Sequence, residues 1–268
     1  TVTILDLMNE PESISAATWK LSAQAAINAI RQVEVNKTIM VEGVGYSSAY
    51  QWVTNGNDTL KDLDDPEDNL MFSAHCYLDR NNSGTHFVWT EEVAAGDELD
   101  GGATLDTNIG VKRISVFIDW LKRNNLRGNI GEMGVAQENP NWLLALDKAI
   151  AYAQANRVSF TYWCSGPFFD NYPYSIGLGN EVADRVQMAV LTKYSNPPKQ
   201  ELTYFITGPK YGTADVDSAD FTLNVRGNVP ERIIFTPTDG GQGGLFTPSS
   251  IEIPAGFNGK ATFKYKAD

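Results

Sequence analysis

Two glutamates lie where the sequence predicts the ends of strands. Glu10 stands in an Asn-Glu-Pro motif directly after the apolar run at residues 3–8, and Glu132 belongs to a Gly-Glu-Met-Gly motif. Cleavage of a glycosidic bond with retention needs an acid that protonates the leaving oxygen and a carboxylate about 5 Å away that attacks the sugar. Glu10 and Glu132 are therefore candidate catalytic residues for that chemistry. The alternative for Glu10 is a helix N-terminus, where the helix dipole favours an acid.

A histidine and a tyrosine on the preceding predicted strand strengthen this interpretation. His75 and Tyr77 are two positions apart, so their side chains share one face of a strand. Tyr77 can donate its hydroxyl to a carboxylate nucleophile and keep it oriented and ionised. A single histidine on a strand is more often structural, but its place next to the strand of Glu132 favours a functional role.

Polar and aromatic residues near the same strand ends are candidates for sugar binding. Asn9 can hydrogen-bond a sugar hydroxyl, and Trp163 ends the strand after that of Glu132, where its ring offers a stacking platform. Trp52 offers a second such surface, and for both tryptophans the alternative is core packing. Glu42 also ends a strand, but it lacks a neighbouring Asn or Tyr, so we expect it to support other residues of the site.

The elements that position these residues alternate between strands and helices. Helical stripes with i, i+3, i+4, i+7 spacing occur at residues 23–30, 114–121 and 142–153, and a final helix is expected around Val182, Val186 and Val190. Strands are predicted at residues 3–8, 38–43, 69–77, 128–132 and 158–163. Apolar strands separated by helices predict an α/β fold with a parallel sheet, and repeated βα units with candidate residues after the strands indicate a (β/α) barrel.

The composition excludes several classes of function. With 33 acidic and 21 basic residues the formal charge is -12, so nucleic acid is not expected as a partner. No run approaches the roughly 20 apolar residues of a membrane span. Cys76 and Cys164 are expected to be small buried residues. His75 and His86 show no paired metal-ligand spacing, so we expect neither a metal nor a cofactor.

The pattern changes after the Asn-Pro-Pro segment at residues 196–198. Short alternating runs at 221–225 and 261–265, with a Gly-rich loop at 240–244, predict a small immunoglobulin-like β-sandwich over residues 200–268. The βα region is then a separate domain over residues 1–195.

In order along the chain, the motifs resemble those of glycoside hydrolase family 5, and in particular its bacterial and fungal endo-β-1,4-glucanases. The resemblance covers residues 1–193 and rests on these segments: Asp6-Leu7-Met8-Asn9-Glu10-Pro11, Ile39-Met40-Val41-Glu42-Gly43, His75-Cys76-Tyr77, Gly131-Glu132-Met133-Gly134 and Trp163. It implies the last five βα units of a (β/α)8 TIM barrel and a retaining mechanism. It also implies Glu10 as acid/base, Glu132 as nucleophile, and Asn9, His75, Tyr77 and Trp163 on the glycone side of the site.

One departure from the family concerns the start of the barrel. The resemblance implies three further βα units before Glu10, so residues 1–193 are not expected to be stable alone. We therefore expect an N-terminal barrel fragment supplied as a separate polypeptide. The C-terminal region resembles modules of secreted bacterial enzymes, which implies an exported protein. A spacer role for this module is favoured over polysaccharide binding, because no Trp follows Trp163.

The expected function is an endo-β-1,4-glucanase with a β-glucan polysaccharide as its substrate. A β-mannanase or xyloglucanase of the same family is the first alternative, because these differ in subsite shape. A carbohydrate-binding remnant without catalysis is the second alternative.

Overall fold

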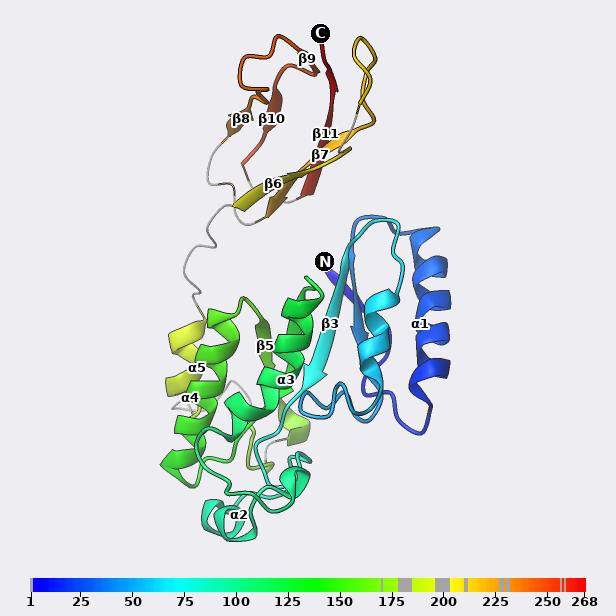
Figure 1. Ribbon diagram of the computed structural model, residues 1–268. Coiled ribbons are helices and arrows are strands. Elements are labelled where there is room, and N and C mark those ends of the chain that lie inside the picture. Colours follow the sequence, from blue (N-terminus) through cyan, green and yellow to red (C-terminus); the bar gives the residue numbers. More distant parts are fainter. Residues whose placement is uncertain are drawn as a thin grey trace. The chain divides into compact units, whose positions relative to one another are not determined.

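The protein folds into two compact units, Thr1–Asn196 and Pro197–Asp268 (Figure 1). The computed structural model describes residues 2–169, 171–177, 185–195, 203–209, 212–226, 229, 232–255, 257 and 259–268. The predicted Asn-Pro-Pro linker at 196–198, and Val182 of the predicted final helix, lie outside the described residues.

A five-stranded parallel sheet forms the centre of the first unit. Its strands pair in sequence order and are β1 (Ile4–Asp6), β2 (Thr38–Glu42), β3 (Leu70–His75), β4 (Gly128–Met133) and β5 (Ser159–Tyr162). All five agree with the strands predicted from the sequence. Parallel strands that follow one another without a reversal of order are arranged as in part of a TIM barrel.

Helices connect and cover these strands (Figure 1). The α-helices are α1 (Ala16–Arg31), α2 (Trp89–Ala95), α3 (Ile109–Arg123), α4 (Pro140–Ala155) and α5 (Met188–Tyr194). Three short 3-10 helices are η1 (Asn57–Asp62), η2 (Glu98–Asp100) and η3 (Pro167–Phe169).

Local capping explains where two of the helices begin. The Ser15 side chain accepts a hydrogen bond from the amide of Thr18 at the start of α1. The Asn139 side chain accepts a hydrogen bond from the amide of Asn141 at the start of α4, and Pro140 occupies its first turn. The last helix begins later than expected. Val186 lies before the start of α5 and is exposed.

Trp52 lies in the core, so the expectation that it forms a stacking surface for sugar is wrong. Its side chain is fully buried, and its ring centroid lies 4.6 Å from that of Phe117 and 5.2 Å from that of Trp120. Both partners belong to α3, and burying three large aromatic side chains together removes much apolar area from water. Cys76 and Cys164 are buried free thiols, as predicted.

The described residues of the second unit form two antiparallel sheets. Strands β6 (Thr203–Thr207), β7 (Phe221–Arg226), β11 (Gly259–Lys266) and β9 (Leu245–Thr247) form one sheet, and β10 (Ile251–Ile253) and β8 (Ile233–Phe235) form the other. Leu223, Val225 and Phe263 belong to its core. The Gly-rich segment is a loop as predicted, held by the Asp239 carboxylate, which accepts hydrogen bonds from the amides of Gly241 and Gly244.

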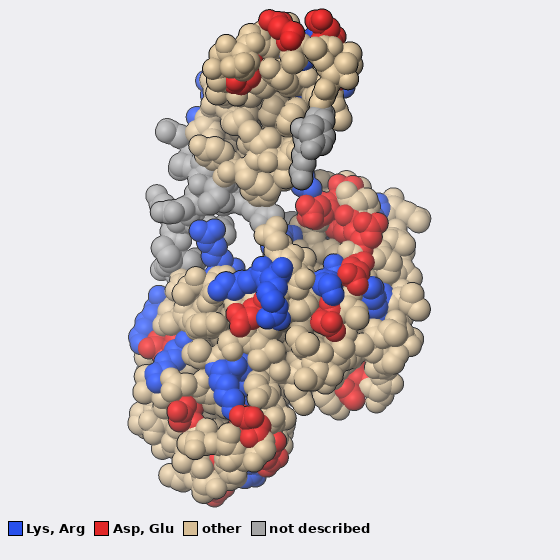
Figure 2. Space-filling model, in the orientation of Figure 1, with Lys and Arg blue, Asp and Glu red and all other residues tan. Residues whose placement is uncertain are grey.

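The surface and the helices add two observations. On the face that Figure 2 shows, Lys and Arg side chains are interspersed with Asp and Glu. Among the described residues, none of the helices combines the length and the apolar character needed to cross a membrane.

The buried position of Trp52 predicts a structural effect when the residue is truncated. Replacing a buried Trp by Ala removes transfer free energy and leaves a cavity, so Trp52→Ala should lower the free energy of unfolding by about 3–5 kcal/mol. Tryptophan fluorescence during urea unfolding measures this, and it reports on the first unit because all six tryptophans lie at or before residue 163.

The matched control is Phe168→Ala, which truncates a side chain that is 90% exposed. It should change the free energy of unfolding by less than about 0.5 kcal/mol. Equal stability of Trp52→Ala and the wild type would contradict the core position.

Candidate active site

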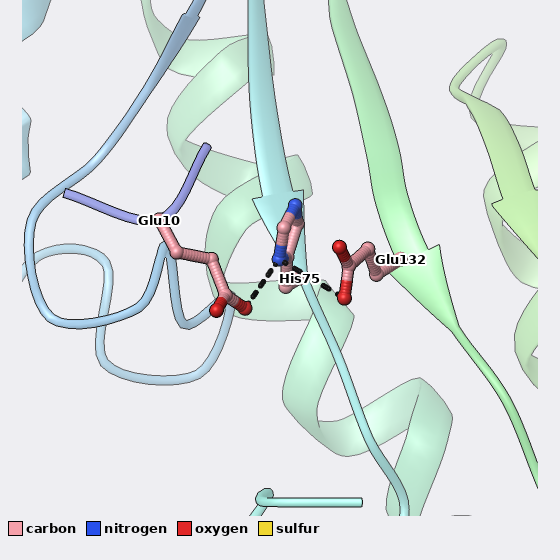
Figure 3. A group of neighbouring side chains, drawn as sticks. All are labelled: Glu10, His75 and Glu132. Carbon is pink, nitrogen blue, oxygen red and sulfur yellow. Dashed lines mark hydrogen bonds and ion pairs between the residues drawn. The ribbon is translucent and has the colours of Figure 1, made fainter. Parts of the chain in front are cut away.

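Three side chains, two from strands and one from the segment after β1, converge at one edge of the parallel sheet (Figure 3). Glu10 follows β1, His75 ends β3, and Glu132 lies in β4. The sheet explains this convergence, because parallel strands bring their carboxyl ends to one edge. His75 and Glu132 are direct partners in the β3–β4 register, which shifts between Ala74 and His75.

The two glutamates approach the same nitrogen of His75 from opposite sides (Figure 3). The distance from Nδ1 of His75 to Oε1 of Glu10 is 2.7 Å, and the distance to Oε2 of Glu132 is 3.6 Å. One ligand atom from each of the three residues lies within 4.8 Å of the other two. The carboxyl groups of Glu10 and Glu132 are therefore close enough to act on one bond.

His75 carries a positive charge at neutral pH. Burial opposes this charge, but hydrogen bonds to Glu10 and Glu42 outweigh it and raise the pKa of His75 to about 10. The distance from its second nitrogen, Nε2, to Oε1 of Glu42 is 3.1 Å. Each N–H of the imidazolium therefore donates to a carboxyl oxygen, and the ring is fixed from both sides.

Glu132 experiences opposing influences on its charge. Burial raises the pKa of Glu132, while the charge of His75 and a hydrogen bond from Tyr77 lower it, and the net shift is upward. The hydroxyl of Tyr77 donates to Oε2 of Glu132 at 2.5 Å, which confirms the predicted contact. Burial and Glu132 together raise the pKa of Tyr77 well above its ordinary value, so the phenol keeps its proton and stays a donor.

The glycine before Glu132 leaves room for the histidine. A Cβ atom at Gly131 would lie 2.3 Å from Oγ of Ser73 and 3.0 Å from Nε2 of His75. A side chain here would clash with the Ser73 hydroxyl first and would also crowd the ring that both glutamates contact. This explains the first glycine of the Gly-Glu-Met-Gly motif in physical terms.

Two further carboxyl groups lie beside the cluster. Oε2 of Glu42 accepts a hydrogen bond from the main-chain amide of Glu10 at 2.7 Å, so Glu42 supports the site as expected. Asp6, on β1, was not predicted. Partial burial of its carboxyl group and the nearby Glu42 raise the pKa of Asp6 to about 6, although the residue lies on an exposed edge strand. An acid inside a strand of a parallel sheet was the available signal, because such strands are usually apolar.

The predicted sugar-binding residues lie in different environments. Asn9 is exposed directly before Glu10. Trp163 follows β5 and is partly buried, with its ring edge-on to Phe169 at a centroid distance of 4.9 Å. Trp52 is remote from a sugar surface because it is enclosed in the core.

The cluster of Glu10, His75 and Glu132 also has the donor atoms of a metal site. The sequence spacing did not predict this arrangement. Both ring nitrogens of His75 already face carboxyl oxygens as hydrogen-bond donors, so a metal at this position would have to displace a proton from the ring. Metal binding requires a neutral imidazole nitrogen, so this charge state works against it.

A parallel βα sheet with two facing glutamates at its carboxyl edge is the type of site that glycoside hydrolases use. The family model "Cellulase (glycosyl hydrolase family 5)" matches residues 1–169. The chain therefore belongs to glycosyl hydrolase family 5.

Named relatives agree with this membership. Endo-beta-1,4-glucanase B of Emericella nidulans is 32% identical over 178 residues, which cover 65% of this chain and 49% of the relative. A solved endo-beta-1,4-glucanase of Xanthomonas axonopodis pv. citri, carrying a triple mutation, is 34% identical with a TM-score of 0.62, and the match covers 71% of this chain and 59% of that one. For Pseudomonas stutzeri endoglucanase Cel5A in complex with cellobiose the identity is 35%, the TM-score is 0.61, and the coverage is 70% and 53%. The chain spans about half the length of the curated relatives it matches.

The hydrogen bond between Tyr77 and Glu132 predicts a pKa change that needs no substrate to detect. This bond lowers the pKa of Glu132, so Tyr77→Phe should raise it further. The pKa rises because the ionised form of Glu132 loses the donor that stabilises it. Carboxyl-carbon NMR titration of Glu132 measures the change.

Tyr152→Phe is the control, because Tyr152 lies on α4 near Asp119. It should leave the titration of Glu132 unchanged. An unchanged pKa of Glu132 in Tyr77→Phe would show that the hydroxyl does not stabilise the carboxylate.

Proposed function

We propose that this chain provides the catalytic residues of an endo-β-1,4-glucanase that hydrolyses cellulose-like chains by a retaining double displacement. Glu132 is the nucleophile and Glu10 is the acid/base. The observation that carries the proposal is that one carboxyl oxygen of Glu10 and one of Glu132 lie within 4.8 Å of each other beside His75. Retaining enzymes place these groups about 5 Å apart, whereas inverting enzymes leave room for a water between them. The endoglucanase names of the relatives support the substrate class.

The contacts of Glu132 suit a nucleophile. Attack on the anomeric carbon requires an ionised carboxylate, and the Tyr77 hydroxyl and the charge of His75 both favour ionisation against the effect of burial. Before the first step Glu10 is protonated on the oxygen that does not face His75, while its Oε1 accepts the hydrogen bond from Nδ1. As Glu132 attacks, the glycosidic C–O bond breaks and Glu10 gives that proton to the leaving oxygen. In the second step Glu10 takes a proton from water, the water oxygen attacks the anomeric carbon, and the bond to Glu132 breaks.

Asn9 and Trp163 are the proposed sugar contacts. Asn9 is exposed beside the acid/base and can reach a hydroxyl next to the reacting carbon. Trp163 lies at the end of β5, the neighbour of the strand that carries Glu132. Its indole can pack on the apolar face of a sugar ring. His75 and Tyr77 act on the glutamates and thereby shape the glycone side.

The remaining assignments concern the whole protein. Residues 1–195 are proposed as the catalytic domain and residues 200–268 as an immunoglobulin-like spacer. Export from the cell follows from the resemblance of that module to parts of secreted enzymes. The separate N-terminal barrel fragment stays a prediction without support from the fold or the relatives.

A hydrolysis assay with polysaccharides tests the function. With the first three βα units of a matched relative supplied as a separate polypeptide, the chain should release reducing ends from carboxymethyl cellulose faster than from mannan, xyloglucan or xylan. Glu132→Gln should lower the rate by about a thousandfold or more, because it removes the nucleophile and keeps the size of the side chain. Glu34→Gln is the control, since Glu34 precedes β2 and lies at the opposite end of that strand from Glu42.

Two results would overturn the proposal. Binding to cellulose without release of reducing ends indicates a carbohydrate-binding protein without catalysis. Hydrolysis that persists in Glu132→Gln rejects the assigned nucleophile. Faster hydrolysis of mannan or xyloglucan than of cellulose would change the assigned substrate but not the proposed mechanism.

A further inference from the structure

Glu42 places a buried carboxylate directly behind the two groups that the proposed reaction uses. It is the last residue of β2, and its side chain is 2% exposed. The indole N–H of Trp19, on α1, donates to the main-chain carbonyl of Glu42 at 2.7 Å. Both the strand and this contact hold the residue in place, so its carboxylate has a fixed position beneath the site.

Each oxygen of this carboxylate has its own partner in the site. Oε2 accepts the main-chain N–H of Glu10 at 2.7 Å, and Oε1 lies 3.1 Å from Nε2 of His75. His75 in turn contacts the carboxylate of Glu10 through Nδ1 at 2.7 Å. Glu42 is therefore linked to Glu10 in two ways. It accepts a hydrogen bond from the main-chain amide of Glu10, and it contacts His75, which in turn contacts the Glu10 side chain.

The backbone of Glu10 needs such a contact. Its φ angle is 47°, in the left-handed region that residues other than glycine rarely adopt. Backbone conformations of this kind persist where surrounding interactions hold them. The hydrogen bond from the Glu10 amide to Glu42 is one such interaction, and it fixes the direction in which the Glu10 side chain leaves the main chain.

The charges around His75 come from four acidic residues. Glu42 faces Nε2, and Glu10 and Glu132 face Nδ1. Asp6, from β1, lies beside Glu42. A hydrogen bond between their carboxyl groups helps to raise the pKa of Asp6. In the described cluster, His75 is the group that carries positive charge among these acids. The hydrogen bond and the charge of Glu42 both favour the imidazolium form.

We propose that Glu42 is a positioning residue, which fixes the backbone of Glu10 and holds His75 as a charged donor between Glu10 and Glu132. This inference rests on the proposed glucanase function. Glu42 itself does not touch the substrate, because its side chain is buried and both oxygens have partners within the protein. Loss of its charge should misplace the acid/base and weaken catalysis while sugar binding is kept.

Glu42→Gln tests the proposal by kinetics and by NMR on the full chain. A misplacement of about 1 Å can cost about 100-fold in rate, so kcat on a soluble cello-oligosaccharide should fall by about 10–100-fold while KM is kept. Removing the neighbouring charge should lower the pKa of His75 by about 1–3 units. Imidazole NMR titration measures this pKa, and His86→Gln assigns the signal because the chain has two histidines.

The matched control is Glu92→Gln. Glu92 is also a buried acid, 1% exposed, but its carboxylate accepts a hydrogen bond from the amide of Arg80 and is away from the cluster. This variant should keep both kcat and the pKa of His75. Unchanged kcat in Glu42→Gln, or an unchanged His75 pKa, overturns the proposal.

A second variant covers the case in which Glu42→Gln does not fold. Glu42→Asp keeps the charge but shortens the side chain, so the pKa of His75 should stay high while kcat falls about tenfold, because one carboxylate no longer reaches both partners. Wild-type kcat in Glu42→Asp would overturn the proposal. A wild-type chain without any hydrolysis would reject the proposed function instead, and the His75 titration in Glu42→Gln would still test the placement.

Discussion

The positive charge of His75 is the interaction on which the site depends. The ring is almost completely buried, so a charge there is unfavourable unless carboxylates compensate for it. Glu10 and Glu42 do so through hydrogen bonds, and Glu132 lies close enough to contribute. The same charge keeps acids that would otherwise repel one another within a few ångströms.

The parallel sheet makes that arrangement possible. Glu10, Glu42, His75 and Glu132 come from four adjacent strands in the order β1, β2, β3 and β4. In this order, the strands of Glu42 and Glu132 are the direct neighbours of β3, and β1, which precedes Glu10, lies one strand further away. The shift in register at the end of β3 sets His75 opposite Glu132, and Gly131 leaves the space that the ring fills. Backbone geometry therefore determines the chemistry as much as the side chains do.

Periodicity in the sequence predicted the five strands of the first unit and the helices α1, α3 and α4, because burial on one face leaves a regular pattern. Glu10, His75, Tyr77 and Glu132 were also identified, since they follow or end those strands. Trp52 was misplaced because a tryptophan in a polar loop has the same local sequence whether it packs under α3 or faces solvent. The double contact of Glu42 was not predictable, because it involves the backbone amide of a residue 32 positions away.

Trapping of the covalent intermediate tests the central claim most directly. A 2-deoxy-2-fluoro cellobioside with a good leaving group slows the second step of a retaining enzyme more than the first, so the glycosyl ester accumulates. Peptide mass spectrometry of the treated chain should show one fluorocellobiosyl group on Glu132, and none in Glu132→Gln. A chain that hydrolyses cellulose but carries no such group, or carries it on another residue such as Glu10, would contradict the account.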